Sequence, residues 1–128
     1  MALSTMYPAK NNSPTTFLTE QITAAATTMT LDDATVLPDA PNLAVLGSED
    51  NAEIVSYTAI SGNVVSGLVR GVHNTVPSVW AAETPVARNF TALDHDRFIE
   101  NINELQSEID ELIAVESDGD DYKLVIGG

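Results

Sequence analysis

The residues of this chain that could carry out chemistry are few, and they do not form a known catalytic pattern. Histidine occurs only at His73 and His95, whereas a zinc site needs about three well-placed nitrogen, sulfur or oxygen ligands. The 128 residues include no cysteine, which excludes disulfides, thiolate metal sites and thiol catalysis. No G-x-S-x-G turn, P-loop or G-x-G-x-x-G motif occurs. We therefore expect a protein that is not an enzyme and that binds no cofactor.

Two other features were weighed as ion sites. Residues 116–121 are dense in carboxylates, but they lack the D-x-D-x-D-G spacing with a distal Glu of an EF-hand. A solvated linker explains them better than a calcium site. His95 falls at an inward position of the helical repeat described below, so three copies would meet on the axis of a trimer. A stacked or water-linked histidine is favoured there over a metal site.

The formal net charge is −14 and is unevenly distributed. Residues 94–121 hold eleven of the nineteen acids and a single base, Arg97. A surface this acidic disfavours binding to nucleic-acid phosphates and to anionic membranes. No apolar run approaches the roughly 18 residues of a membrane span, and the N-terminal residues lack the basic and then apolar pattern of a signal peptide. We expect neither nucleic acid nor membrane as a partner.

The longest regular element predicted is a helix over residues 91–116. Apolar residues recur in it at alternating spacings of four and three, which is typical of the seam between supercoiled helices. This seam consists of Phe98, Ile102, Leu105, Ile109 and Leu112. Ile99 and Ile113 lie beside it at e positions and widen the apolar stripe, which favours three or more helices. These residues alone leave the copy number open.

Two interpretations of this stripe remain open. The helix could lie on the core of its own domain, since three heptads are a short repeat. It could also associate with copies of itself. We favour self-association because nearly every position outside the stripe is polar, and because no second helix of similar length is predicted to receive it.

Residues 15–90 are predicted to form a small β-domain, either a sandwich or a barrel. Short runs of β-forming residues separated by turn signals predict strands over residues 15–18, 21–24, 27–31, 43–46, 53–60, 64–69 and 86–90. Ser61-Gly62-Asn63 predicts a hairpin between the fifth and sixth strands, and Trp80 is expected to cover the core. A domain of this size buries only about 60% of its unfolded surface, which favours stabilisation by packing against copies.

The two ends lack such patterns. Residues 1–14 contain prolines that favour extended backbone, and they could be a frayed terminus or a docking arm. Their apolar residues predict docking onto a neighbouring protein through Leu3, Met6, Tyr7 and Pro8. Residues 117–128 form an acidic linker followed by one short strand-like run, which would need a partner sheet.

Four local patterns occur together: the arm YPAKNNSP, the strand pair EIVSYTAISGNVVSGLVRG, the tripeptide VAR at residues 86–88, and FTALDHDRFIENI. In these patterns the chain resembles short virion proteins of tailed bacteriophages that infect Gram-positive, especially clostridial-type, hosts. Similar β-modules, with an ITAA…TTMTLDDAT…LP opening, recur in tail-fibre and baseplate proteins. The resemblance covers roughly residues 6–105. The chain departs from it at residues 72–76, where family members usually carry a Gly-rich stretch.

The resemblance implies a homotrimeric structural component of the virion, made in the host cytoplasm and located at the tail tip, baseplate or tail fibre. A capsid head fibre or decoration protein would use the same architecture and is the main alternative. A carbohydrate-binding module is a further alternative. It is less favoured because Trp80, the three tyrosines and the three phenylalanines do not cluster along the chain.

Overall fold

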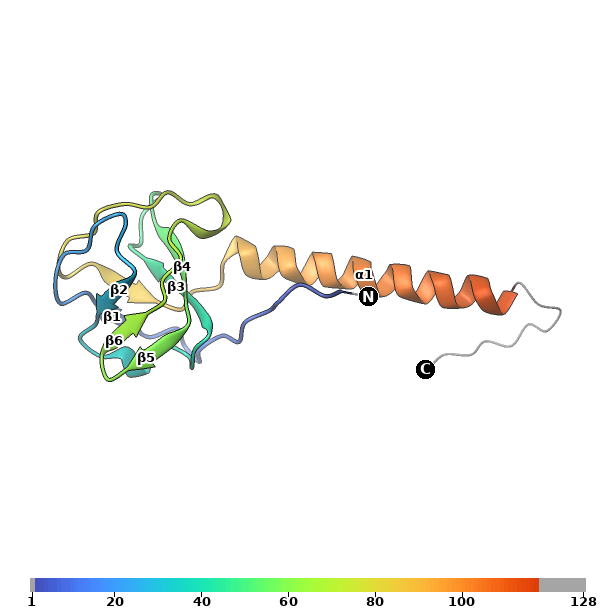
Figure 1. Ribbon diagram of the computed structural model, residues 1–128, viewed down its shortest axis with the longest axis horizontal. Coiled ribbons are helices and arrows are strands. Elements are labelled where there is room, and N and C mark those ends of the chain that lie inside the picture. The colour runs from blue at the N-terminus through green and yellow to red at the C-terminus, as the bar shows by residue number, and fades with distance from the viewer. Residues whose placement is uncertain (1, 118–128) are drawn as a thin grey trace. The chain divides into compact units, whose positions relative to one another are not determined.

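The computed structural model describes residues 2–117 (Figure 1). The chain divides into two units. One is a β-domain formed by Tyr7–Ala92, and the other combines the N-terminal segment up to Met6 with the chain from Leu93 onward. The strand-like run predicted near the C-terminus lies outside the described residues.

The β-domain contains two antiparallel sheets that pack on each other (Figure 1). The four-stranded sheet has the order β1-β7-β3-β4, and the three-stranded sheet has the order β2-β6-β5. The strands are β1 (Thr15–Phe17), β2 (Thr28–Thr30), β3 (Asn42–Leu46), β4 (Glu53–Tyr57), β5 (Ala59–Ser61), β6 (Val64–Ser66) and β7 (Pro85–Ala87), with short 3-10 helices at η1 (Ala34–Val36) and η2 (Val72–Asn74). The predicted mainly β architecture is confirmed in the form of two packed sheets.

Side chains from both sheets form one core, because alternate residues of each strand point to the same face. Its fully buried members include Leu18, Met29, Leu31, Leu46, Val55, Tyr57, Val65 and Val86. The hydroxyl of Tyr57 donates a hydrogen bond to the carbonyl of Pro38 at 2.6 Å. Burial raises the pKa of this phenol, so it remains a neutral donor. Trp80 packs against the core, which confirms the expectation from the sequence.

The prediction of one strand over residues 53–60 is wrong. The chain there passes from one sheet to the other, with β4 pairing with β3 and β5 pairing with β6. Thr58 lies at the crossing, where a Cβ on Gly67 would come within 1.8 Å of the Thr58 hydroxyl oxygen. Gly67 also has a φ of 68°, a left-handed conformation that ends β6 early and favours glycine. The predicted hairpin is confirmed, with Ile60 paired with Val65 across it.

Two further strands differ from expectation. Residues 21–24 form no strand, and Ile22 makes only an isolated bridge to Trp80. The last strand covers Pro85–Ala87 instead of residues 86–90. Beyond it the side chain of Arg88 is directed into a buried polar cluster, which is described below.

The long helix is confirmed as α1 (Ala92–Ser117). Its 26 residues correspond to a length of roughly 39 Å at 1.5 Å per residue. Asp94 lies in the first turn, where a carboxylate is favourable for the helix dipole.

Candidate functional site

A completely buried carboxylate lies at the start of β4. Glu53 is 0% exposed and accepts five hydrogen bonds. The guanidinium of Arg70 donates two of them, from Nε to Oε2 at 2.7 Å and from Nη2 to Oε1 at 2.8 Å. Trp80 Nε1 donates at 2.9 Å, and the backbone amides of Gly71 and Ser78 each donate at 3.0 Å. All these donors converge on the two oxygens of one side chain.

This arrangement keeps Glu53 ionised. Burial alone would raise the pKa of its carboxyl, but the hydrogen bonds from Arg70, Trp80 and two backbone amides outweigh burial and lower the pKa below its ordinary value. Arg70 also donates to the carbonyl of Ser78 at 2.6 Å. Both oxygens of Glu53 already accept hydrogen bonds from these donors. Its carboxylate is therefore poorly placed to take a proton from a substrate as a general base. Its role is structural: it closes the loop of residues 71–78 at both ends.

The loop of residues 71–78 contains residues 72–76, where the virion proteins that this chain resembles usually carry a Gly-rich stretch. His73 and Asn74 adopt left-handed conformations, with φ of 56° and 68°, which glycine adopts without strain. Thr75 fixes the turn by accepting from the amide of Ile54 at 3.0 Å and donating to the carbonyl of Val72 at 2.8 Å. The chain therefore builds with ordinary residues a loop conformation that glycine would adopt more easily.

A second buried charge, Arg88, holds the segment before β1. Its side chain is 1% exposed, and its Nε donates to Oδ1 of Asn42 at 2.7 Å. Its Nη2 donates to the carbonyl of Tyr7 at 3.3 Å, while Asn42 Nδ2 donates to the carbonyl of Pro8 at 3.0 Å. The hydroxyl of Ser13 donates to the carbonyl of Arg88 at 2.9 Å. These contacts fix residues 7–13 to the β-domain.

The first residues of the arm belong to the helical unit. The amide of Ser4 donates to Asn101 Oδ1 at 2.7 Å, and Asn101 Nδ2 donates to the carbonyl of Ser4 at 3.0 Å. Ser4 Oγ donates to Glu100 Oε2 at 2.7 Å. Asn101 is 4% exposed, whereas Leu3 and Met6 are 49% and 50% exposed. Both halves of the arm therefore have hydrogen-bond partners within the chain.

The predicted docking residues thus have different surroundings. Tyr7 and Pro8 are bound through their backbone carbonyls to Arg88 and Asn42, while Leu3 and Met6 keep about half of their surface exposed. Docking of these four residues on another protein remains a prediction.

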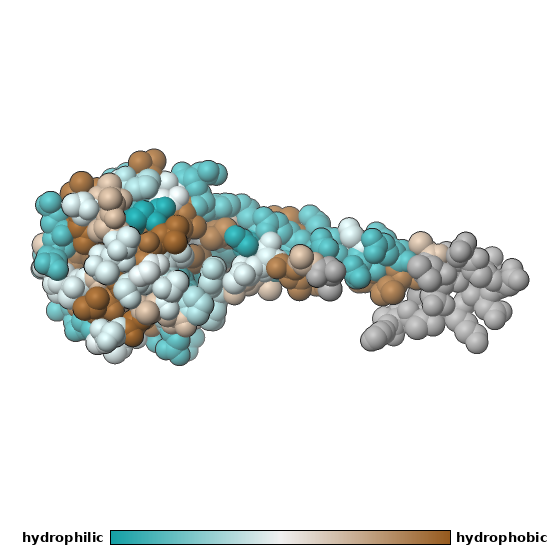
Figure 2. Space-filling view, viewed as in Figure 1, coloured by the Kyte–Doolittle hydropathy of each residue, from teal (hydrophilic) through white to brown (hydrophobic). Residues whose placement is uncertain are grey.

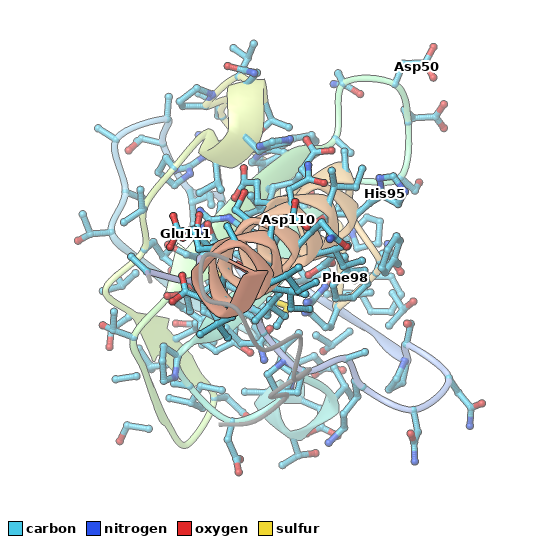
Figure 3. All side chains as sticks on the ribbon, turned by 90° about the vertical axis from the view of Figure 1, so that its right-hand side faces the viewer. Asp50, His95, Phe98, Asp110 and Glu111 are labelled. Carbon is cyan, nitrogen blue, oxygen red and sulfur yellow. The ribbon has the colours of Figure 1, made fainter. Side chains whose placement is uncertain are left out.

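The predicted seam is exposed on α1. Figure 2 shows hydrophobic residues along the helix among hydrophilic ones, and Figure 3, which looks along α1, shows Phe98 and Glu111 on different sides. The five seam residues are between 43% and 64% exposed: Phe98, Ile102, Leu105, Ile109 and Leu112. Ile99 and Ile113, which widen the stripe, are 44% and 47% exposed.

Charged side chains largely avoid the positions next to this seam. The e and g positions from residue 99 to residue 113 are Ile99, Asn101, Gln106, Glu108 and Ile113. Glu108 is the single charged residue among them. The other acids of this stretch, such as Glu104, Asp110 and Glu111, occupy b, c and f positions. Apart from Glu108, the acidic residues of this stretch therefore face away from the surface on which another helix would lie.

Over residues 2–117 no group of three or more His, Cys, Asp or Glu side chains is placed to hold a metal ion. The ring of His95 is 62% exposed, with Nδ1 3.8 Å from a carboxylate oxygen of Asp96. No helix in this part of the chain is long and apolar enough to cross a membrane.

Comparison with models of known protein families gives no match, and comparison with curated proteins gives no significant match. Function is therefore argued from the surfaces just described, together with the local resemblance of the sequence.

Reasoning from the sequence missed the buried polar residues Glu53, Arg70, Arg88, Asn42 and Asn101. A signal was present for the first three, because each is a charged residue within or next to a run of β-forming residues. Charges in such places are usually paired when they are buried. No comparable signal marked Asn101, which is one of many polar residues in the helix.

We predict that Glu53→Gln strongly destabilises the β-domain at neutral pH. It leaves the guanidinium of Arg70, whose side chain is 7% exposed, without its counter-charge, and breaking a buried ion pair costs about 3–5 kcal/mol. Denaturant unfolding followed by Trp80 fluorescence at pH 7 measures this loss. Glu49→Gln, at an exposed loop position, is the control and should unfold like the wild type.

The ion pair between Glu53 and Arg70 also predicts that the stability of the β-domain depends on pH. Because the pKa of Glu53 is lower in the folded state, its stabilisation is present above the unfolded-state pKa of about 4.3 and is lost as the pH falls further. The stability difference between wild type and Glu53→Gln should therefore shrink on acidification towards pH 3. A constant difference from pH 7 to pH 3 would contradict this account.

We further predict that two truncations of the arm differ in effect. Removal of residues 2–6 should leave the stability of the β-domain unchanged, because its buried contacts begin at Tyr7. Removal of residues 2–14 takes away one backbone acceptor of Arg88 and one of Asn42, and each buried unsatisfied group costs about 1–3 kcal/mol. Thermal unfolding monitored by Trp80 fluorescence compares the two, and equal melting temperatures would show that the arm contributes nothing.

Proposed function

We propose that this protein is a non-enzymatic structural component of a bacteriophage virion. In this proposal it forms a homotrimer through α1 and serves as an attachment protein of the tail tip, baseplate or tail fibre. The observation that carries the proposal is the exposed heptad seam of α1. The local resemblance to virion proteins supports the biological setting.

Self-association is supported by the exposure and chemistry of the seam. Side chains that a helix packed on a core would bury are 43–64% exposed. A second copy offers the same apolar stripe, and the e and g positions beside it, with Glu108 as their one charged residue between residues 99 and 113, limit repulsion between two acidic helices. Isoleucine at two e positions widens the stripe, which favours three helices over two.

A structural role is also supported by the buried charges, because the hydrogen bonds described for them are to groups of the same chain. Glu53 and Arg70 satisfy each other and the ends of one loop, and Arg88 satisfies backbone carbonyls near the start of the chain. Trp80 is half-buried and its Nε1 donates to Glu53. This ring is therefore poorly placed to stack on a sugar, which disfavours the carbohydrate-binding alternative.

We predict that charges in the seam abolish self-association. Ile102→Asp combined with Ile109→Asp would bury two carboxylates per helix, at a cost of several kcal/mol. Asn103→Asp combined with Ser107→Asp adds the same charge at exposed positions outside the stripe. Sedimentation equilibrium should show trimers for the wild type and the control, and monomers for the seam variant. A monomeric wild type at micromolar concentration would refute the proposal.

We also predict that an antibody against the β-domain labels purified phage particles at the tail. Electron microscopy of labelled particles makes the measurement, with particles lacking the gene as control. Labelling of the capsid would replace the tail assignment with the head-fibre or decoration alternative. Absence of the protein from purified particles would overturn the virion assignment itself.

A further inference from the structure

One side chain of α1 fixes the start of the chain in register on the helix. The amide group of Asn101 pairs with both the backbone N–H and the backbone C=O of Ser4, as a neighbouring β-strand would. A buried amide is costly unless it is hydrogen-bonded, and here both of its hydrogen-bonding groups are used on the arm. The hydroxyl of Ser4 adds a bond to Glu100, the residue before Asn101.

The position of this clamp relates it to the seam. Asn101 occupies a g position, next to the seam residues Phe98 and Leu105. In a parallel coil the g position of one helix faces the e position of the next helix. In this register a g residue pairs with the e residue five positions further on, which is Gln106 for Asn101. The preceding e residue on the same flank is Ile99, an apolar side chain that is 44% exposed and belongs to neither the a nor the d set.

The clamped segment carries no charged side chain and exposes two apolar ones. Residues 2–6 are Ala, Leu, Ser, Thr and Met, and the side chains of Leu3 and Met6 on either side of the clamp are 49% and 50% exposed. Such a segment has no charge with which to select a basic or an acidic partner. Its exposed Leu3 and Met6 match an apolar surface, and a second copy presents Ile99 on the flank that faces Asn101.

We propose that residues 2–6 form part of the self-association surface. Held by Asn101 on their own helix, they lie in the groove between this helix and that of the next copy, where Leu3 and Met6 pack near Ile99 of the second copy. This inference rests on the trimer proposed above. It assigns Leu3 and Met6 to a second copy of this chain instead of a different virion protein.

The first test compares two asparagines of one helix. Asn101→Ala removes the clamp, while Asn103→Ala removes an exposed amide two residues away. Sedimentation equilibrium should show dissociation of the Asn101→Ala trimer at concentrations on the order of tenfold higher than for the wild type. For a monomer–trimer equilibrium this is a hundredfold change in the dissociation constant, or about 2.8 kcal/mol per trimer. Asn103→Ala should match the wild type.

The clamp and the arm should also act as one unit. Deletion of residues 2–6 should weaken the trimer at least as much as Asn101→Ala does. Adding Asn101→Ala to the deletion should then have no further effect, because the interaction is already absent. Additive effects of the two changes would overturn the inference, since Asn101 would then stabilise the trimer independently of the arm.

The second test detects the contact between copies directly. The chain has no cysteine, so chains carrying Thr5→Cys can be mixed with chains carrying Ile99→Cys and treated with a short bismaleimide. Cross-linked heterodimers are expected from this pair, and not when Ile99→Cys is replaced by Ser107→Cys, which lies at an f position. Trimers without the Thr5–Ile99 product would overturn this inference alone. A monomeric wild type would overturn the trimer as well.

Discussion

The ion pair between Glu53 and Arg70 is the interaction on which the β-domain depends most. An unpaired buried charge costs several kcal/mol, so a 0% exposed carboxylate is tolerated only with a full set of donors. Those donors come from Arg70 in the segment after β6, from both ends of the loop of residues 71–78, and from Trp80. Folding of these separate segments is therefore coupled, because detachment of any one of them would expose Glu53 or Arg70 or leave its buried charge without a partner.

The small size of the domain explains why buried polar groups have such a role. The β-domain of Tyr7–Ala92 has strands of three to five residues, which offer few ladder hydrogen bonds and little apolar surface. Long irregular segments between these strands need their own fixation. Arg88 provides it for the segment before β1 in the way Arg70 provides it for the loop after β6. A guanidinium suits this task because its five donors reach several carbonyls at once.

Features that depend on residues close together in the chain could be predicted from the sequence, whereas contacts between distant residues could not. The helix, its apolar seam and the β5–β6 hairpin follow from local periodicity and turn residues, and the structure contains all three. The passage of the chain between sheets at Thr58 depends on the close approach of Gly67, which is a tertiary contact. The pairing of Asn101 with Ser4 joins residues 97 positions apart, and no local pattern could indicate it.

The distribution of charge on α1 bears on how strong a trimer can be. In the proposed trimer, acids at b, c and f positions would repel between copies over the Debye length, about 8 Å at physiological salt, while the short apolar seam would supply the attraction. With little more than two heptads between Phe98 and Leu112, the balance between the two is narrow. An apolar arm clamped beside the seam would enlarge the attractive surface without adding charge. This is a physical reason for a buried asparagine at position 101, where a coil of this composition would ordinarily carry an exposed polar residue.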